Sequence, residues 1–424
     1  MEVESKTFLK GACMKNFKNK KLLYPILGIL LLLAVAFSNG FTKEKNEEIY
    51  KYLKLFSQVL KLIEDNYVTE VSPKDLIYGA INGMLNSLDP YSSLMKPEEF
   101  KELEIETKGS FTGIGIEITI KDDVITVVAP IEDTPAWKAG IKPGDKILKI
   151  EDKPTKGMSI TEAVKLLRGP KGTKVTLTIL RNDKDIKEIT LIRDVIPIRS
   201  VKYKLLEPNY AYVRITNFQE KTHQELINAL EELEKQQLKG LILDLRYNPG
   251  GLLSSAIEVA DEFLEKGLIV SVKGKAKNSE MTFEAKPNPS NKKHPYPIVI
   301  LINHGTASAS EIVTGALKDH KRALVLGQKS FGKGRVQTVI PLDDGYAVKL
   351  TTAFYYTPNG VCIDTIGIVP DIEIPMVELA AKEKSKNKDE EDLIKPWTSP
   401  EEDFQVKMAL SILKNLKEIS KLNF

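Results

Sequence analysis

Apolar residues recur at different spacings along this chain, and the changes of spacing divide it into parts. Between Glu44 and about Phe100 they recur every three or four positions, which is typical of amphipathic helices, and Pro73 begins the second of these. From about 105 to 194, short strand-like runs surround one helical run, TEAVKLLRG. Beyond Val195, apolar runs such as GLILDLR and PIVILIN alternate with helical ones, which predicts buried strands connected by helices.

These changes predict a multidomain α/β protein. Residues 273–297, rich in proline, lysine and asparagine, are expected to form a solvated loop, and a last amphipathic helix is expected from Glu401 to Leu416. The helical domain contains nothing reactive, so packing and assembly are its expected roles. The predicted segments are an N-terminal tail with an apolar stretch (1–42), a helical domain (43–104), a β-rich domain with one or two helices (105–194), an α/β layered core (195–376), and a linker with a C-terminal helix (377–424).

The N-terminus combines a cluster of lysines with Leu22–Phe37, a run of 16 residues without a charge. This arrangement is typical of an export signal preceded by a cytoplasmic tail. Ala34-Val35-Ala36 has the small-x-small pattern that a signal peptidase cleaves, whereas extension through Phe41 gives roughly 20 residues, enough to span a bilayer. A cleaved signal and a retained transmembrane signal-anchor both remain open. Either one places the rest of the chain outside the cytoplasm.

Charge and cysteine content exclude two broad classes of function. The 61 basic and 58 acidic residues leave a net charge of only +3, so a nucleic acid partner is not expected. Cys13 and Cys362 have no C-x-x-C spacing and no companion ligands, which argues against a thiol redox centre or a zinc site. No metal and no cofactor are expected.

A glycine-containing turn opens the β-rich segment. Its glycines leave backbone N–H groups uncovered beside a strand edge, which suits the binding of a peptide carboxylate, although a hairpin turn without a ligand is the alternative. The string A-G-I-x-x-G-D-x-I-L follows from Ala139 to Leu148, and with the helix before the last strands the whole segment resembles a PDZ domain. The resemblance implies that the turn binds polypeptide C-termini. The residues of the turn are Phe111, Thr112, Gly113, Ile114, Gly115 and Ile116.

The string HGTASASEIVTGALKDH contains a candidate nucleophile, Ser308. Ser308 and Glu311 have the S-x-x-E spacing of a capping box, so a helix cap without a chemical role is the simpler interpretation. A serine at the start of a helix also lies near the positive end of the helix dipole, and the N–H of Ala309 would then be an oxyanion donor. Gly250 or Gly251, in a turn after a buried strand, would supply the second donor, and the sequence leaves open which one.

A catalytic role for Ser308 requires a base. His304 and His320 flank the predicted helix, but His320 lies roughly 18 Å along it from the serine. Lys333, between two glycines in SFGKGRVQ, is the better candidate, although a solvated loop lysine is the alternative. A neutral lysine needs its pKa lowered from about 10.4 toward neutrality, a shift worth roughly 4 kcal/mol. Gln337 could hold the amine without adding a negative charge if the chain bends between the two residues.

Three strings together point to a family. DLRYNPGG at 244–251, GTASASE at 305–311 and SFGKGRVQ at 330–337 resemble those of the carboxyl-terminal processing peptidases, which join a PDZ domain to a serine-lysine protease domain. The resemblance runs in the family's order from the early helices to the C-terminal helix. It implies an α/β layered core of the ClpP/crotonase kind. It also implies that Ser308 is the nucleophile, Lys333 the general base and Gln337 its support.

The sequence therefore predicts an extracytoplasmic serine endopeptidase that binds substrate C-termini through its PDZ domain and cleaves near the tail. Its expected partners are proteins or peptides with free C-termini and, through the N-terminal segment, the membrane. The helical elements at both ends are candidate surfaces for a homodimer.

Asp244 and Arg246 are expected to be structural partners. The alternative is a membrane-tethered PDZ scaffold that binds tails without catalysis; a trypsin-like protease is excluded because G-[DN]-S-G-G is absent.

Overall fold

The computed structural model of the chain describes residues 47–121, 123–182, 184–275, 280–287, 294–375 and 399–419. The chain forms two compact units, Met1–Met84 and Leu85–Phe424. The apolar segment Leu22–Phe37, expected to be a signal or an anchor, lies outside the described residues. Among the helices within those ranges, none is both long enough and apolar enough to cross a bilayer.

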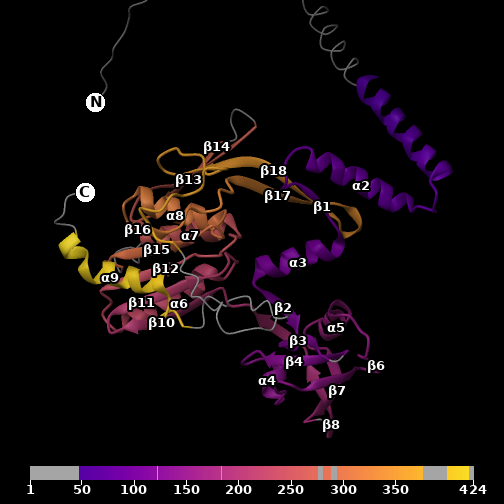
Figure 1. Cartoon of the computed structure of the whole chain (residues 1–424), viewed down its shortest axis with the longest axis horizontal. Helices are drawn as coiled ribbons and strands as arrows, with labels where there is room; N and C mark the ends of the chain where they lie inside the picture. Colours follow the sequence, from indigo (N-terminus) through magenta and orange to yellow (C-terminus); the bar gives the residue numbers. More distant parts are fainter. Residues whose placement is uncertain are drawn as a thin grey trace, which may run out of the picture. The chain divides into compact units, whose positions relative to one another are not determined.

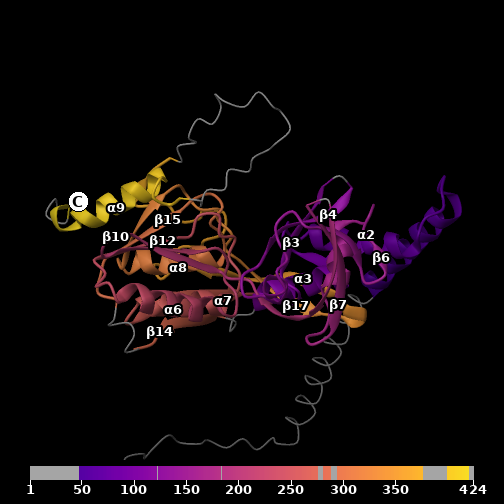
Figure 2. The same ribbon diagram turned by 90° about the horizontal axis from the view of Figure 1, so that it is seen from below.

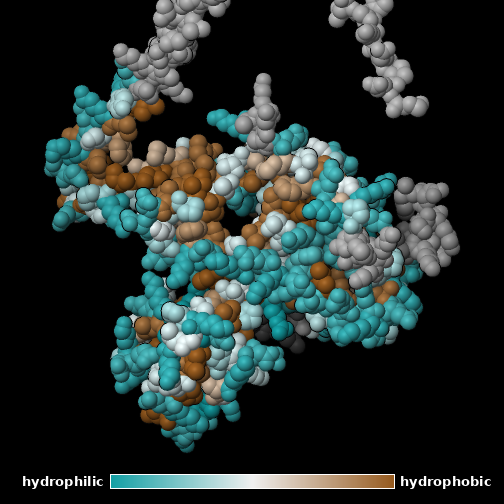
Figure 3. All heavy atoms as spheres, turned by 180° about the vertical axis from the view of Figure 1, so that it is seen from behind, coloured by the Kyte–Doolittle hydropathy of each residue, from teal (hydrophilic) through white to brown (hydrophobic). Residues whose placement is uncertain are grey.

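The first described helices follow the predicted pattern. Residues 47–66 are helical, and α2 (Pro73–Asn86) begins at the predicted proline. The helix over 47–66 exposes large apolar side chains, and residues of this kind are brown on the molecular surface in Figure 3. An exposed apolar stripe of this kind is typical of a surface that a partner covers. Its residues include Ile49, Tyr52, Leu53, Phe56 and Val59, which are 42% to 57% exposed.

A six-stranded sheet forms the core of the second unit (Figure 1). Its strands, in spatial order, are β10 (Val201–Glu207), β11 (Tyr210–Ile215), β12 (Gly240–Asp244), β15 (Ile298–Ile302), β16 (Ala323–Gly327) and β19 (Ile372–Glu373). Every neighbouring pair is parallel except β10 with β11. Parallel neighbours need crossover connections. Helices α6, α7 and α8 lie in the first three of these connections, as the alternating pattern predicts, whereas β17 and β18 lie between β16 and β19.

Helices cover both faces of this sheet (Figure 2). They are α6 (Thr222–Glu234), α7 (Leu253–Phe263), α8 (Ala309–Asp319) and α9 (Phe404–Ile419). Successive residues of a strand point to opposite faces, so Leu241 and Leu243 pack in the core cluster that contains α6, α7 and α8. Ile242 packs on the other face with Val406 and Ala409 of α9. Burial on both faces explains why these strands read as unbroken apolar runs.

The second unit also contains an antiparallel sheet. Its strands are β1 (Ser93–Met95), β13 (Gly267–Gly274), β14 (Glu280–Ala285), β17 (Arg335–Pro341) and β18 (Ala347–Tyr356). β18 joins the others, because it pairs with β1, β13 and β17. The prediction of a solvated loop over 273–297 is wrong here, since β14 lies within that range and pairs with β13, with Lys273 opposite Glu280. Composition alone does not reveal this pairing, because the prolines, lysines and asparagines around β14 dominate the composition of the range.

His294 is buried rather than solvated. It is 5% exposed, and its ring lies between two carboxylates, with Nδ1 2.5 Å from Glu234 and Nε2 3.0 Å from Glu262. Burial favours the neutral ring, but the hydrogen bonds to Glu262 and Glu234 outweigh it and raise the pKa of His294 above its ordinary value. Both partners come from helices distant in the sequence, so the surrounding prolines and lysines gave no sign of this contact.

The β-rich segment forms a separate sheet with its own core, as predicted. Its elements are β2 (Ser110–Gly113), β3 (Ile116–Lys121), β4 (Val124–Pro130), α4 (Pro135–Lys138), β5 (Lys146–Ile150), β6 (Lys153–Pro154), α5 (Ile160–Leu167), β7 (Lys174–Arg181), β8 (Asp185–Ile192) and β9 (Asp194–Pro197). The sheet order is β3-β4-β5-β7-β8, so β3 is an edge strand, and α5 packs beside it. β2 pairs with β9, and α3 (Pro97–Lys108) precedes β2.

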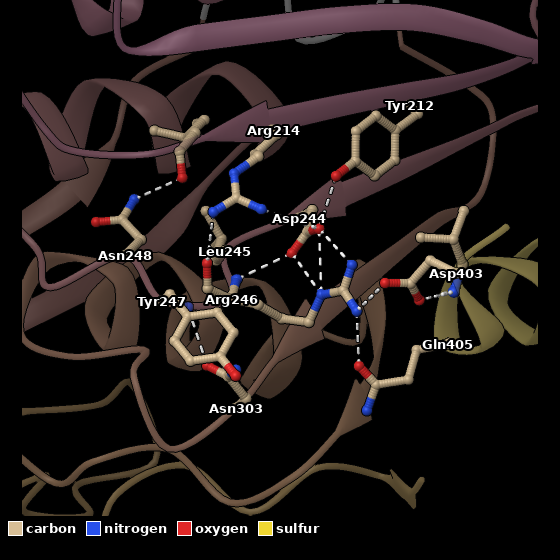
Figure 4. A network of polar contacts seen from close by, with 12 residues as sticks. Tyr212, Arg214, Asp244, Leu245, Arg246, Tyr247, Asn248, Asn303, Asp403 and Gln405 are labelled. Carbon is tan, nitrogen blue, oxygen red and sulfur yellow. Dashed lines mark hydrogen bonds and ion pairs between the residues drawn. The ribbon is translucent and has the colours of Figure 1, made fainter. Parts of the chain in front are cut away.

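A buried charge network attaches α9 to the end of β12 (Figure 4). Asp244 accepts hydrogen bonds from Arg246 Nη2 and from Tyr212, both at 2.7 Å. Burial alone would raise the pKa of Asp244, but the Arg246 charge outweighs it and lowers this pKa. Arg246 Nη1 donates in turn to Asp403 at 2.9 Å and to Gln405 at 2.8 Å. Arg246 is therefore a structural partner of Asp244, and it also tethers the C-terminal helix.

Replacing Arg246 with alanine should lower the free energy of unfolding by about 3–5 kcal/mol, because Asp244 would remain charged and buried without its main partner. Asp403→Asn is the matched control. It removes the negative charge of a second partner of Arg246 but keeps a side chain that can cap α9, so the free energy of unfolding should fall by about 1 kcal/mol or less. Urea unfolding followed by far-ultraviolet circular dichroism measures both. Equal losses in the two variants would contradict the central place of Arg246.

Candidate functional site

Ser308 occupies the residue before α8 in a strained backbone conformation. Its φ of 54° and ψ of −115° lie in a region that side chains other than glycine rarely adopt, at a cost of about 1–3 kcal/mol. Neighbouring contacts maintain this strain, because the N–H of Ala307 donates to the Asn248 carbonyl at 3.0 Å. Ser308 and Glu311 form the predicted capping box at the start of α8. Backbone strain of this kind is concentrated at functional sites.

Glu311 connects the start of α8 to the loop that carries Lys333. One carboxylate oxygen, Oε2, accepts the N–H of Ser308 at 2.8 Å and the N–H of Lys333 at 2.9 Å. The other, Oε1, accepts the Ser330 hydroxyl at 2.5 Å and the N–H of Gly332 at 2.7 Å. Glu311 is fully buried, and burial raises its pKa although these four donors favour the charged form. The backbones of Ser308 and Lys333 therefore lie close together, because the N–H groups of both residues donate to the same Glu311 oxygen.

The Lys333 side chain is partly buried. Burial lowers the pKa of Lys333, the charge of Lys349 lowers it further, and Glu311 acts in the opposite direction; the net shift is downward. The Nζ lies 5.1 Å from the ring centroid of Tyr91. Among the described residues, this amine has no hydrogen-bond partner. A lysine in this environment suits the role of a base.

Gln337 lies on β17, four residues after Lys333. The pairing of β17 with β18 shifts register between Val336 and Gln337, whereas the sequence predicts a bend near Gly334. Lys333 itself precedes the strand, which begins at Arg335. The Nε2 of Gln337 is buried and has no hydrogen-bond partner among the described residues. A buried amide without a partner is costly and is typical of a position that a ligand or a moving side chain satisfies.

The glycine turn after β12 packs directly on the start of α8. A Cβ added to Gly250 would lie 2.8 Å from the Ser308 Cβ and 2.9 Å from the Ala309 nitrogen, so only glycine fits. The N–H of Gly250 donates to Asn248 Oδ1 at 2.9 Å. The N–H groups of Gly251 and Ala309, by contrast, have no acceptor among the described residues. Both amides remain available as donors, whereas the Gly250 amide is already occupied.

The two histidines that flank α8 have other contacts. The Nε2 of His320 lies 2.7 Å from the carbonyl oxygen of Leu268, and the His304 ring packs edge-on against Tyr247 with centroids 5.5 Å apart. Neither has a hydrogen bond to Ser308 in the described residues. Ser310, the second serine of the string, is fully buried and donates to the Asn248 carbonyl at 3.0 Å. These contacts leave Lys333, whose backbone N–H shares an acceptor with that of Ser308, as the better base candidate.

The predicted carboxylate-binding turn lines a small groove between β3 and α5. Five of its six predicted residues face the groove, and the exception is Thr112, whose carbonyl accepts the N–H of Gly169 at 3.4 Å. Gly115 has a φ of 79°, and an added Cβ would lie 2.4 Å from Thr134, so glycine is required there. The groove is lined by Phe111, Gly113, Ile114, Gly115, Ile116, Ile118, Val164, Leu167 and Arg168.

Sequence reasoning missed three residues of the Ser308 site. Glu311 was recognised only as half of a capping box, because its bonds to 330–333 cross about 20 residues of sequence. Asn248, in the string DLRYNPGG, positions both Gly250 and Ala307. Tyr91 comes from the turn before β1, more than 200 residues before Lys333, and its only signal was an aromatic residue within LDPYSS.

Known proteins resemble most of this chain. The profile of peptidase family S41 matches residues 209–374, that of a PDZ domain matches 126–181, and that of the activating protease CtpB N-terminal domain matches 35–99. The carboxy-terminal-processing protease of Bartonella bacilliformis is 46% identical over 377 residues, which cover 87% of this chain and 85% of that protein. The carboxy-terminal processing protease CtpA of Bacillus subtilis is 39% identical over 375 residues, covering 88% and 78%. A solved photosystem II D1 C-terminal processing protease is 32% identical, with a TM-score of 0.44, covering 76% of this chain and 92% of that one.

Replacing Glu311 with alanine should free the loop around Lys333, because four donors lose their shared acceptor. The amide protons of Gly332 and Lys333 should exchange with solvent about ten to a hundred times faster, as expected for the loss of charged hydrogen bonds. Thr314→Ala is the matched control, since Thr314 is buried one turn further along α8 and bonds only within the helix. Hydrogen exchange read by mass spectrometry measures both, and equal exchange in the two variants would contradict the role of Glu311.

Proposed function

The chain belongs to peptidase family S41 and is a serine-type carboxyl-terminal processing peptidase, and we propose that Ser308 and Lys333 are its catalytic pair. The observation that carries this proposal is the Glu311 oxygen shared by the two backbone amides. It is supported by the strained backbone of Ser308 and by the lowered pKa of Lys333. A base needs to be near its nucleophile and to lose its proton more easily than an ordinary lysine, and the shared acceptor and the lowered pKa favour these two conditions.

The first half of the reaction forms an acyl-enzyme. The neutral Lys333 amine takes the proton of the Ser308 hydroxyl while Oγ bonds to the scissile carbonyl carbon, and the carbonyl electron pair moves to its oxygen. Four rotatable bonds allow the lysine side chain to bring its amine to the serine. The C–N bond then breaks, and the leaving amine takes a proton from the Lys333 ammonium. Water, activated by the same lysine, hydrolyses the ester and restores Ser308.

The negative charge on the tetrahedral intermediate requires backbone donors. We assign this role to the N–H of Ala309 together with the glycine turn. Of the two glycines, Gly251 is the better candidate, because the N–H of Gly250 already donates to Asn248. Gln337 supports Lys333 in this proposal, since its buried Nε2 lacks a partner among the described residues and its neutral side chain can orient the amine without adding a negative charge.

Substrate tails are proposed to bind in the groove between β3 and α5. β3 is an edge strand of its sheet, so an extended peptide can add a strand to it by backbone hydrogen bonds. The turn at Phe111–Ile116 lies at one end of that edge, where uncovered N–H groups suit a terminal carboxylate. Apolar side chains of α5, including Val164 and Leu167, line the opposite wall and suit an apolar last residue.

Localisation and assembly extend the proposal. The lysine cluster and the apolar run Leu22–Phe37 support an extracytoplasmic protein, either anchored by this segment or secreted after its cleavage. N-terminal sequencing of the mature protein distinguishes the two. The exposed apolar stripe on the helix over 47–66 supports a homodimer, and sedimentation measurements test it.

A fluorophosphonate probe that reacts with activated serines tests the catalytic pair. Labelling should disappear in Ser308→Ala and fall at least about a hundredfold in Lys333→Ala, because a general base typically contributes a factor of this size. In the unaltered chain, the labelling rate should rise with pH as the Lys333 ammonium loses its proton. The midpoint should lie below about 10.4, the ordinary lysine value, because the pKa of Lys333 is lowered.

Lys329→Ala is the control, because Lys329 is an exposed lysine four residues before Lys333. The probe should label Ser308 in this variant at the normal rate. Labelling of Ser308→Ala at the normal rate would refute the nucleophile. A protein that binds tail peptides, is not labelled and cuts nothing would instead match the PDZ scaffold alternative.

Tail recognition is tested by peptide binding to the Ser308→Ala variant, which cannot cleave the peptide. A fluorescent peptide with a free C-terminal carboxylate should bind at least about ten times more tightly than the same peptide with a C-terminal amide, a difference of about 1.4 kcal/mol. Val164→Arg should weaken binding by a similar factor, because it places a charge in the apolar groove. Val128→Arg, at an exposed position on β4, is the control. Equal binding of acid and amide would argue against tail recognition.

A further inference from the structure

The aromatic ring of Tyr91 contacts the proposed catalytic base. The Lys333 Nζ lies 5.1 Å from the ring centroid, within the roughly 6 Å over which an aromatic face attracts a cation. Tyr91 is neither a proton donor nor a nucleophile in the proposed reaction. A role for its ring rests on the proposed function, because the ring acts on the base assigned there.

Local hydrogen bonds fix the position of Tyr91. Asp89 Oδ1 accepts the backbone N–H groups of Tyr91 at 2.7 Å and Ser92 at 2.8 Å, which closes a tight turn. The Ser92 hydroxyl accepts the N–H of Thr351 from β18 at 3.1 Å, and β1 continues the pairing with Ser93 opposite Lys349. The backbone that carries the ring is therefore held beside β18 by a turn and a strand rather than by a mobile loop.

Other charges face Lys333 from each neighbouring element. Lys349 on β18 disfavours its ammonium form, and Glu311 on α8 favours it. Arg335 on β17 approaches the same ring at 5.7 Å, but Asp364 at 3.0 Å and Asp89 at 3.7 Å balance its charge. No carboxylate of a described residue forms an ion pair with the Lys333 amine. Among the described residues, the Tyr91 ring and the Glu311 carboxylate therefore favour the ammonium, and the ring does so through a close contact with the amine.

We propose that Tyr91 is a positioning residue that holds the protonated form of Lys333 produced when the serine loses its proton. The proton moves from the Ser308 hydroxyl to the Lys333 nitrogen, so a positive charge appears beside the ring as the Oγ–carbon bond forms. The negative face of the ring stabilises that charge without donating a proton or forming a salt bridge. A carboxylate in its place would hold the proton too firmly, and an aliphatic side chain would leave the new charge poorly solvated.

The pH dependence of fluorophosphonate labelling tests this role. In Tyr91→Leu, the ammonium loses the ring face, so the midpoint of the labelling rate should fall by about half a pH unit, the size expected of an exposed to partly buried cation–π contact. Tyr91→Phe keeps the ring and removes only the hydroxyl, so its midpoint should equal that of the unaltered chain. A merely structural role would reduce the labelled fraction in Tyr91→Leu without moving the midpoint, and that result would overturn the proposal.

A second comparison decides the question if Tyr91→Leu does not fold. Phenylalanine and pentafluorophenylalanine, incorporated at position 91, have nearly the same shape, but fluorination removes the negative face of the ring. The fluorinated protein should show the lower midpoint, and equal midpoints would overturn the proposal. If the unaltered chain is not labelled at Ser308 at all, the proposed function fails, and this inference fails with it. Labelling that depends on Ser308 and Lys333 but is insensitive to the ring would refute the inference alone.

Discussion

The candidate site depends on the hydrogen bonds that the Glu311 carboxylate accepts. This carboxylate lies in the first turn of α8 and accepts donors from the start of its own helix and from the loop around Lys333. A buried carboxylate without partners would be costly, so the loop has to fold onto the helix for the core to form. The same four bonds that stabilise the buried charge therefore bring a serine and a lysine together. Stability and site geometry follow from one contact.

The sheet beneath provides the rigid frame for this contact. β12 ends at Asp244, and the turn after it places Asn248 and Gly250 against Ser308. Asn248 is fully buried and bonds to Ile215 on β11, so the turn is held by the neighbouring strand. On the other face, Arg246 joins the same strand end to α9. Helices on both faces thus support a single strand end, which is where sites in parallel sheets usually form.

Two features of the site place opposite demands on the lysine. Burial and the charge of Lys349 favour the neutral amine, whereas Glu311 and, in our proposal, the Tyr91 ring favour the ammonium. A base with a very low pKa would bind the serine proton weakly. A base with a very high pKa would already be protonated and could not accept it. A balance between these influences is what proton transfer at a moderate pH requires. The groups that exert these influences lie on α8, on β18 and in the turn before β1.

The sequence by itself determined the order of the segments, the fold class, the family and the strings that contain Ser308, Lys333 and Gln337. It could do so because apolar periodicity and glycine spacing are local properties, read within a few residues. The same local view made residues 273–297 a loop and His294 a solvated residue, since the partners of β14 and of His294 lie far away in the chain. Only the tertiary structure decided that Glu311 bridges the two candidates, that the Gly250 amide is occupied, and that Tyr91 contacts the lysine. Each of these features depends on contacts between segments that are distant in the sequence. A buried charge or amide pairs with whichever group lies near it in the folded chain, and the spacing of residues along the sequence does not show which group that is.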